Sequence, residues 1–435
     1  MKTKSILILI IFIAAIIRMP TFFLPKNNGD QIQYIALASK INQKGLSEYN
    51  IYDIQCNLDK TKTYIIFYPL SNGNLINYYK GYWREPLHHR PFLFPLLISF
   101  SHNIFSKGKT FKAINTNLKK DFLKIPKNCV KEQFYCAIIP FLSSILFIYT
   151  TFLLGKTMFS EKNALLSSFI IAITPIDIFC AQKILADSLF AFLSTASVLL
   201  LILYIKSKKA IHLFLSGIFA GLSYLTRQNG LILMLISITV FIVASSHEII
   251  GKKQALKAFL IHFLVSGLIS SIWFAKLYAH YKTLLYIPLK NHYQEIKNDK
   301  WFKILSKRPF YMYIINPLVQ MPLYIFSFLN FRYFKNLPIE RKFNILILTS
   351  WSLILIAPLF FFSIGKELRY ILPALAPLSI LSAEGIIYFY NELCKKNRTA
   401  GKIIMLFTFL FSLIWGASIG LNVVLTNLLF IWIPF

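Results

Sequence analysis

Two aspartates in this sequence stand where a carboxylate could act on a substrate at a membrane surface. Asp30 follows an apolar N-terminal segment directly, and Asp187 stands between two long apolar segments. A carboxylate at the mouth of a membrane cavity can serve as a general base. Each aspartate also stands where a helix is expected to begin, so N-capping is an alternative explanation for both.

Basic residues that could hold a phosphate accompany these aspartates. Arg90 leads a short apolar segment and could bind a phosphate bidentately, although an interfacial Arg can also anchor to anionic lipid. Lys183 precedes Asp187 by four residues and would pair with it if the turn is helical. The same membrane face is expected to carry Arg18, Arg227 and Arg369. A base combined with arginines suits chemistry on a lipid phosphate.

The composition is that of a membrane protein. Hydrophobic residues make up 56% of the 435 residues and charged residues only 15%, which is too little charge for the surface of a soluble domain. The apolar residues form blocks long enough to cross a bilayer, about 17–25 residues each, and helix pairs every backbone group within such a block. The formal charge of +30 comes mainly from Lys and Arg in the loops between the blocks. Such loops stay in the cytoplasm, so the charge reflects membrane topology. We therefore expect no nucleic-acid partner.

The pattern predicts an all-α polytopic membrane protein with about eleven transmembrane helices, within a range of ten to thirteen. The first, within 1–24, is expected to be uncleaved, because its apolar run ends without a signal-peptidase site. Lys and Arg gather in the loops that this arrangement places inside, so we expect a multi-pass protein of the plasma (inner) membrane with a cytoplasmic N-terminus. The other helices are expected at 134–155, 163–181, 187–205, 210–226, 229–246, 257–280, 311–331, 343–364, 369–390 and 402–421.

A large extracytoplasmic loop is predicted between the first two helices. It spans 25–133, and residues 134–435 then form the multi-helix transmembrane domain. Residues 91–105 are apolar but too short to cross, so a juxtamembrane helix on the outer surface is expected there. A second surface helix is expected over 32–44, where apolar residues recur at near-helical spacing: Ile35, Leu37, Ala38 and Ile41.

The sequence indicates no metal site. Its five cysteines lack metal-ligand spacing, and the adjacent His88 and His89 have no evident third ligand. No cofactor is certain on this basis, and a divalent metal stays open without being indicated. Cys56 and Cys129 share the outer loop, where a disulfide and two free thiols are both open.

Around these residues the chain resembles the GT-C glycosyltransferases that use polyprenyl-phosphate sugars. That family includes the protein O-mannosyltransferases and the aminoarabinose–lipid A transferases. The resemblance rests on an Arg ending the first helix, then Gly29-Asp30 with Tyr34, then Arg90-Pro91, Ile184-Leu185-Ala186-Asp187, Thr226-Arg227 with Asn229-Gly230, and Arg369-Tyr370. The chain departs from the family at Gln31, where Glu is frequent, at Gln228, where Pro is usual, and in a Lys-rich insertion at 107–131.

The resemblance implies a GT-C-type fold and an inverting glycosyltransferase. Such an enzyme would move a sugar from a polyprenyl-phosphate donor to an acceptor hydroxyl on protein, lipid A or surface glycan, at the periplasmic or extracytoplasmic face. Asp30 would be the base, and Asp187 would position the base or the acceptor. The donor phosphate would be bound by Arg90, Arg227, Arg369 and Lys183, with Arg18, Tyr34 and His89 in support.

Two other classes of membrane protein remain as alternatives. A transporter or flippase of lipid-linked sugars would carry charges in mid-helix and internal repeats, and the sequence has few of the former and none of the latter. A surface-polysaccharide ligase or polymerase also uses lipid-linked donors, but its large loop normally comes late in the chain. Here the large loop comes first.

Overall fold

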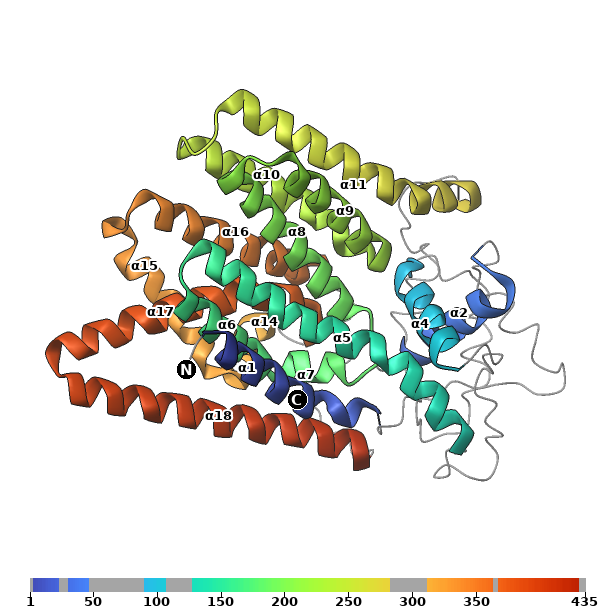
Figure 1. Cartoon of the computed structure of the whole chain (residues 1–435), viewed down its shortest axis with the longest axis horizontal. Helices are drawn as coiled ribbons and strands as arrows, with labels where there is room; N and C mark the ends of the chain where they lie inside the picture. The colour runs from blue at the N-terminus through green and yellow to red at the C-terminus, as the bar shows by residue number, and fades with distance from the viewer. Residues whose placement is uncertain are drawn as a thin grey trace.

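The computed structural model describes residues 3–22, 30–46, 90–106, 127–281, 311–362 and 367–429. Within these ranges the chain is built from α-helices and short 3-10 segments and contains no strand (Figure 1). The predicted all-α class is therefore confirmed. In chain order the elements are α1 (Thr3–Arg18), η1 (Met19–Phe22), α2 (Asp30–Lys44), α4 (Leu93–Phe105), α5 (Lys127–Met158), α6 (Glu161–Ala172), α7 (Pro175–Ala181), α8 (Asp187–Ser207), α9 (Ala210–Thr226), η3 (Gln228–Leu231), α10 (Ile232–Ser246), α11 (Lys252–Tyr281), α14 (Met312–Gln320), η4 (Pro322–Phe328), α15 (Leu329–Tyr333), η5 (Phe334–Asn336), α16 (Ile339–Phe362), η6 (Leu368–Ala374), α17 (Leu375–Lys396) and α18 (Arg398–Leu429).

The protein is a multi-pass membrane protein, but the predicted count of eleven spans is not confirmed. Seven helices in the described ranges are long and apolar enough to cross, or up to nine if two bent pairs each count as one span. One pair, α6 with α7, bends by 61°, and the other, α14 with the segment from Pro322 to Asn336, bends by 119°. In addition, α1 has 16 residues and α9 has 17, or about 24–26 Å of helix, which is short for a hydrocarbon core of about 30 Å.

The long helices form a bundle in which α8 is central and α11 and α18 are peripheral. α8 packs between α5 and α9, and its membrane window is 83% buried, against 28% for α11 and 22% for α18. The contact of α9 with α11 depends on Gly217 and Gly221, since a Cβ at Gly221 would lie 2.5 Å from the Cβ of Ile269. These are the small-residue positions that let two membrane helices approach closely.

The two predicted surface helices are present and pack together at one end of the bundle, on the right in Figure 1. α2 buries Ile35, Leu37, Ala38 and Ile41, the apolar positions that the sequence predicts. α4 has 13 residues, too few to cross a membrane, and it packs against α2, α5 and α9. Residues 47–89 and 107–126, which include Cys56 and His89, lie outside the described ranges.

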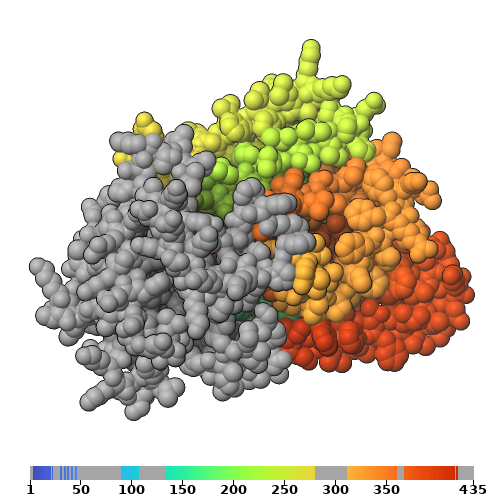
Figure 2. All heavy atoms as spheres, turned by 180° about the vertical axis from the view of Figure 1, so that it is seen from behind, coloured from blue at the N-terminus to red at the C-terminus, as the bar shows by residue number. Residues whose placement is uncertain are grey.

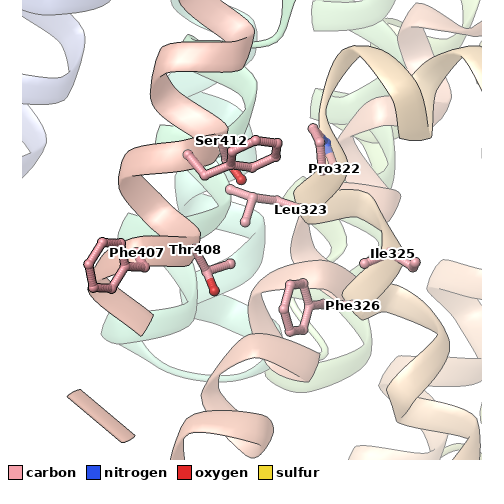
Figure 3. A pocket seen from close by; sticks show the side chains of 8 residues that line it. Pro322, Leu323, Ile325, Phe326, Phe407, Thr408 and Ser412 are labelled. Atoms are coloured by element: carbon pink, nitrogen blue, oxygen red, sulfur yellow. The ribbon is translucent and has the colours of Figure 1, made fainter. Parts of the chain in front are cut away.

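Away from these helices, α18 runs along the lower edge of the bundle in Figure 1, and in Figure 2 its red atoms lie at the lower right, below the orange ones. A cavity of about 340 Å³ lies between η4 and α18 (Figure 3). Its lining is Pro322, Leu323, Ile325, Phe326, Phe407, Thr408, Phe411 and Ser412. Since no ionisable side chain lines it, this cavity is not a candidate for the predicted chemistry.

Candidate active site

Five of the predicted site residues meet in one ion-pair cluster, which comprises Asp30, Arg90, Asp187, Arg227 and Arg369. Asp30 is its centre, at the first residue of α2. Oδ1 accepts a hydrogen bond from Nη2 of Arg90 at 2.6 Å, and Oδ2 accepts one from Nη2 of Arg369 at 2.6 Å. Arg90 immediately precedes the α4 region and Arg369 lies in η6, so elements far apart in sequence converge on one carboxylate.

Asp187 joins the same cluster through arginines. Arg227 donates to its Oδ1, and Nη1 of Arg369 lies 3.7 Å from its Oδ2. Arg369 therefore links the two aspartates. The predicted pairing of Asp187 with Lys183 is wrong, because Lys183 lies in the turn between α7 and α8 and its ammonium lies over the Phe179 ring, 4.1 Å from the centroid.

Neither aspartate is explained by helix capping. Asp30 and Asp187 are each the first residue of their helices, and the N-cap of α8 is Ala186, which makes no side-chain hydrogen bond. Their carboxylates are engaged in the arginine contacts described above. The capping alternative is therefore unnecessary for either residue.

Two tyrosines lie against the three arginines. The Arg90 guanidinium lies 4.6 Å from the centroid of Tyr34, and Tyr370 is contacted by Arg227 at 5.1 Å and by Arg369 at 5.4 Å. Tyr34 in turn packs edge-on against Phe94 of α4, with centroids 4.9 Å apart. Cation–π contacts of this kind orient guanidinium planes, so the arginines are held by their faces as well as by the carboxylates.

A glycine turn places Arg227. α9 ends at Thr226, and Arg227 is extended, with φ −148° and ψ 135°, before η3 begins. The turn closes tightly, since a Cβ at Gly230 would lie 2.4 Å from the backbone nitrogen of Tyr224. Only glycine fits such a close backbone approach, which explains in physical terms why Gly230 follows the Thr226-Arg227 pair.

The cluster is charged and only partly open to solvent. Asp30 is 29% exposed, Arg90 and Arg369 are each 10% exposed, and Asp187 is 4% exposed. Burial opposes ionisation of Asp30, but Arg90 and Arg369 together hold its pKa well below its usual range. Burial, reinforced by the positive charge of Arg369, lowers the pKa of Lys183 to about 8. Perturbed groups gathered in this way are typical of functional sites.

Sequence reasoning missed two residues of this region. Glu367 forms an ion pair with Arg369, with Oε2 2.5 Å from Nε, and its closeness to Arg369 in the chain was the available signal. Gln31 is 3% exposed, and its Oε1 accepts a hydrogen bond from the backbone nitrogen of Ile184 at 3.0 Å. No pattern in the sequence points to that contact.

Arg18 does not join the cluster, although it was predicted in its support. It is completely buried and forms an ion pair with Asp177 of α7, with Nη2 2.5 Å from Oδ2. Among the predicted supporting residues, Tyr34 contacts the cluster, and His89 lies outside the described ranges. Where the chain is described, no group of three His, Cys, Asp or Glu residues could hold a metal ion.

Fold and site together define a class of protein: a polytopic, all-helical membrane protein with a carboxylate–arginine cluster at one end of its bundle. Residues 129–273 match the family model of the dolichyl-phosphate-mannose-protein mannosyltransferases, which confirms the family resemblance predicted from the sequence. The matched part runs from α5 into α11 and contains Lys183, Asp187 and Arg227. A comparison with curated proteins finds no match.

Solved structures of two relatives share the fold. ArnT from Cupriavidus metallidurans bound to undecaprenyl phosphate matches with a TM-score of 0.57 at 13% identity, over 89% of this chain and 60% of that one. An oligosaccharyltransferase from Archaeoglobus fulgidus, in complex with Zn and sulfate, matches with a TM-score of 0.58 at 17% identity, over 94% and 53%. The chain thus spans between half and two thirds of these proteins, and the likeness is one of fold.

Proposed function

We propose that this protein is an inverting glycosyltransferase that moves a sugar from a polyprenyl-phosphate donor to an acceptor hydroxyl. The observation that carries the proposal is the convergence of Arg90 and Arg369 on Asp30, each at 2.6 Å. The family match supports it, as do two structures of similar fold: ArnT holds undecaprenyl phosphate, and the archaeal AglB holds an inhibitory peptide and a dolichol-phosphate.

Two guanidiniums that converge on one carboxylate also define a place for one phosphate. Arg forks match phosphate oxygens bidentately, so a donor phosphate would compete with Asp30 for Arg90 and Arg369. Once the arginines turn to the phosphate, the interactions that lower the pKa of Asp30 weaken. Asp30 then becomes a better acceptor for a proton. Donor binding would thereby free the base that the reaction needs.

The chemical step follows from these roles. The acceptor oxygen attacks the anomeric carbon, and the bond from that carbon to the phosphate oxygen breaks on the opposite side, with its electron pair passing to the phosphate. The acceptor proton moves to Asp30. The leaving phosphate needs charge stabilisation, which Arg90 and Arg369 would supply. Asp187 would act through Arg227 and Arg369, which it contacts, as a positioning residue.

The cluster is proposed to face the extracytoplasmic side. α8 begins at Asp187, in the cluster, and ends with Lys206 in its last turn, followed by Lys208 and Lys209. The cluster and this Lys-rich loop therefore lie at opposite ends of a 21-residue helix. Because Lys-rich short loops stay in the cytoplasm, the cluster belongs outside, where an acceptor protein, lipid or glycan would be met.

A transfer assay tests the proposal. Membranes that contain the protein would be incubated with labelled polyprenyl-phosphate sugars and a panel of acceptors, and Asp30→Asn would be compared with wild type. Loss of a general base typically costs 10²- to 10⁴-fold in rate, so a drop of about that size is expected. Glu340→Gln is the matched control, because Glu340 pairs with Lys206 at the other end of α8.

Two outcomes would contradict the proposal. Full transfer by Asp30→Asn would remove Asp30 as the base. Movement of the lipid-linked sugar across proteoliposome membranes, with no transfer to any acceptor, would favour the transporter alternative instead.

A further inference from the structure

Gln31 connects two parts of the candidate site. It follows Asp30 on α2, and its side chain is buried, 3% exposed. Its Oε1 accepts a hydrogen bond from the backbone N–H of Ile184 at 3.0 Å. The two residues are 153 positions apart in the chain, so this contact forms only when the surface helix docks on the bundle.

Ile184 belongs to the turn between α7 and α8. Inside this turn the N–H of Leu185 donates to the carbonyl of Lys183 at 2.9 Å, and α8 then begins at Asp187. The turn therefore carries the Lys183 ammonium and leads into the Asp187 carboxylate. One hydrogen bond from the Ile184 N–H to Gln31 thus ties the segment that carries Asp30 to the turn that carries Lys183 and leads into Asp187.

The neutral amide at position 31 matters for the charge of the cluster. Within the described residues, three carboxylates (Asp30, Asp187 and Glu367) face three arginines (Arg90, Arg227 and Arg369), and Lys183 adds one further positive charge. A Glu at this position could accept the same hydrogen bond, but it would place a fourth carboxylate next to Asp30 and beside the Lys183 turn. That charge would offset the positive charge of Lys183.

We propose that Gln31 is a positioning residue of the anion site: its side chain fixes the Lys183 turn against α2, and its neutral amide leaves Lys183 available to a phosphate. The inference rests on the proposed function for the identity of the anion. The tie between α2 and the turn stands on the geometry alone.

Two substitutions separate the hydrogen bond that Gln31 accepts from the effect of its neutral charge. Gln31→Glu keeps an acceptor of the same size and adds a charge, whereas Gln31→Met keeps the size and removes the acceptor. The control is Gln254→Glu, which adds the same charge at an exposed position near the start of α11. Binding of undecaprenyl phosphate to the full-length protein in detergent micelles would be measured, together with hydrogen exchange of the peptide that contains Ile184.

Gln31→Glu should weaken binding of undecaprenyl phosphate roughly tenfold at pH 7, because a second carboxylate next to Asp30 in a partly buried site repels the phosphate. The loss should fade as the pH falls and the new carboxyl is protonated. Exchange at Ile184 should remain slow in this variant. Gln31→Met should instead speed that exchange, and Gln254→Glu should change neither quantity.

Equal binding of undecaprenyl phosphate by wild type and Gln31→Glu at pH 7 would overturn the charge role of Gln31. Unchanged exchange at Ile184 in Gln31→Met would overturn the tie. If the wild type does not bind undecaprenyl phosphate at all, the proposed function fails, and the exchange experiment still decides whether Gln31 holds the turn.

Discussion

Among the described residues, Arg and Asp side chains form ion pairs in two places, which differ in access to solvent and in the number of partners. Arg18 and Asp177 form a pair with both side chains completely buried. In the site cluster, Asp30 is 29% exposed and the arginines are 10–19% exposed. The buried pair is closed to any ligand, whereas the cluster can be reached by one.

Hydrogen bonding sharpens the difference. The Arg18 guanidinium donates four hydrogen bonds within the protein. Its acceptors are the Ser144 hydroxyl, the carbonyls of Ala14 and Ala172, and the Asp177 carboxylate. It thereby joins α1 to α5, α6 and α7. Arg369, by contrast, contacts three carboxylates that also serve other arginines or face solvent. An Arg that is saturated by backbone and hydroxyl groups holds helices together, and an Arg shared among carboxylates can exchange one anion for another.

The largest expected effect is a loss of stability when the buried Arg18–Asp177 pair is broken. Arg18→Met leaves Asp177 buried without its cation, and breaking a buried pair in this way costs about 3–5 kcal/mol of stability. Thermal unfolding of the protein in detergent should register the loss. The double variant Arg18→Met/Asp177→Leu should recover much of it, because no uncompensated charge then remains. If Arg18→Met unfolded at the wild-type temperature but no longer bound undecaprenyl phosphate, Arg18 would belong to the binding site, and the contrast between the buried pair and the cluster would be wrong.

For Arg369, which contacts three carboxylates, we expect a substitution to weaken ligand binding more than stability. Arg369→Lys keeps the charge but cannot reach Asp30, Asp187 and Glu367 together, because an ammonium is a point charge without a fork. Hydrogen bonds to charged groups contribute about 1.5–3 kcal/mol, so binding of undecaprenyl phosphate should weaken roughly 10- to 150-fold. Arg341→Lys is the control, since Arg341 pairs with Glu384 away from the cluster. If Arg369→Lys bound undecaprenyl phosphate as tightly as wild type, or more tightly, Arg369 would not exchange a carboxylate for the phosphate.

Much of this arrangement was readable from local sequence. Each predicted transmembrane segment is largely helical where it is described, because apolar blocks leave the backbone no other way to pair in lipid. The apolar face of α2 followed from the spacing of its apolar residues, and the short length of α4 followed from the length of its apolar run. Asp30, Arg90, Asp187, Arg227 and Arg369 were each predicted because an ionisable residue near membrane depth, at the outer end of an apolar segment, is a functional candidate.

The partners of these residues could not be read in the same way. The pairing of Arg18 with Asp177 and of Gln31 with Ile184 joins residues more than 150 positions apart, and only the packing of helices decides such contacts. The span count was not confirmed for two local reasons. One is that α1 and α9, with 16 and 17 residues, are short for a span. The other is that Pro175 and Pro322 stand at the bends that divide two predicted spans, and the residue before a Pro tends to leave the helical region.

A smaller effect concerns Lys183, which forms no ion pair with any carboxylate in the described part of the chain. Its pKa is lowered to about 8, so the ammonium loses its proton as the pH rises from 7 to 9. Affinity for undecaprenyl phosphate should fall by up to about tenfold across this window. Stability should change in the opposite sense: a Lys whose pKa is lowered by folding makes the fold more stable as the pH rises from about 8 towards the unfolded value.

Lys183→Arg provides the control for this pH effect. An arginine stays protonated across the window, so the binding profile of the variant should be flat from pH 7 to 9. A wild-type profile as flat as that of the variant would show that Lys183 does not contact the anion. Titration of undecaprenyl phosphate itself affects both proteins alike and cancels in the comparison.

The smallest expected effect tests how the open cluster is held in place. Tyr370 lies against both Arg227 and Arg369, and a cation–π contact contributes about 0.5–2 kcal/mol. Tyr370→Leu should therefore weaken binding of undecaprenyl phosphate about fivefold, whereas Tyr370→Phe, which keeps the ring, should bind like wild type. Tyr333→Leu removes a similar contact with Arg332 and should leave binding unchanged. If Phe and Leu at position 370 weaken binding equally, the hydroxyl matters and the ring face does not, and the arginines of the cluster are then oriented by their carboxylates alone.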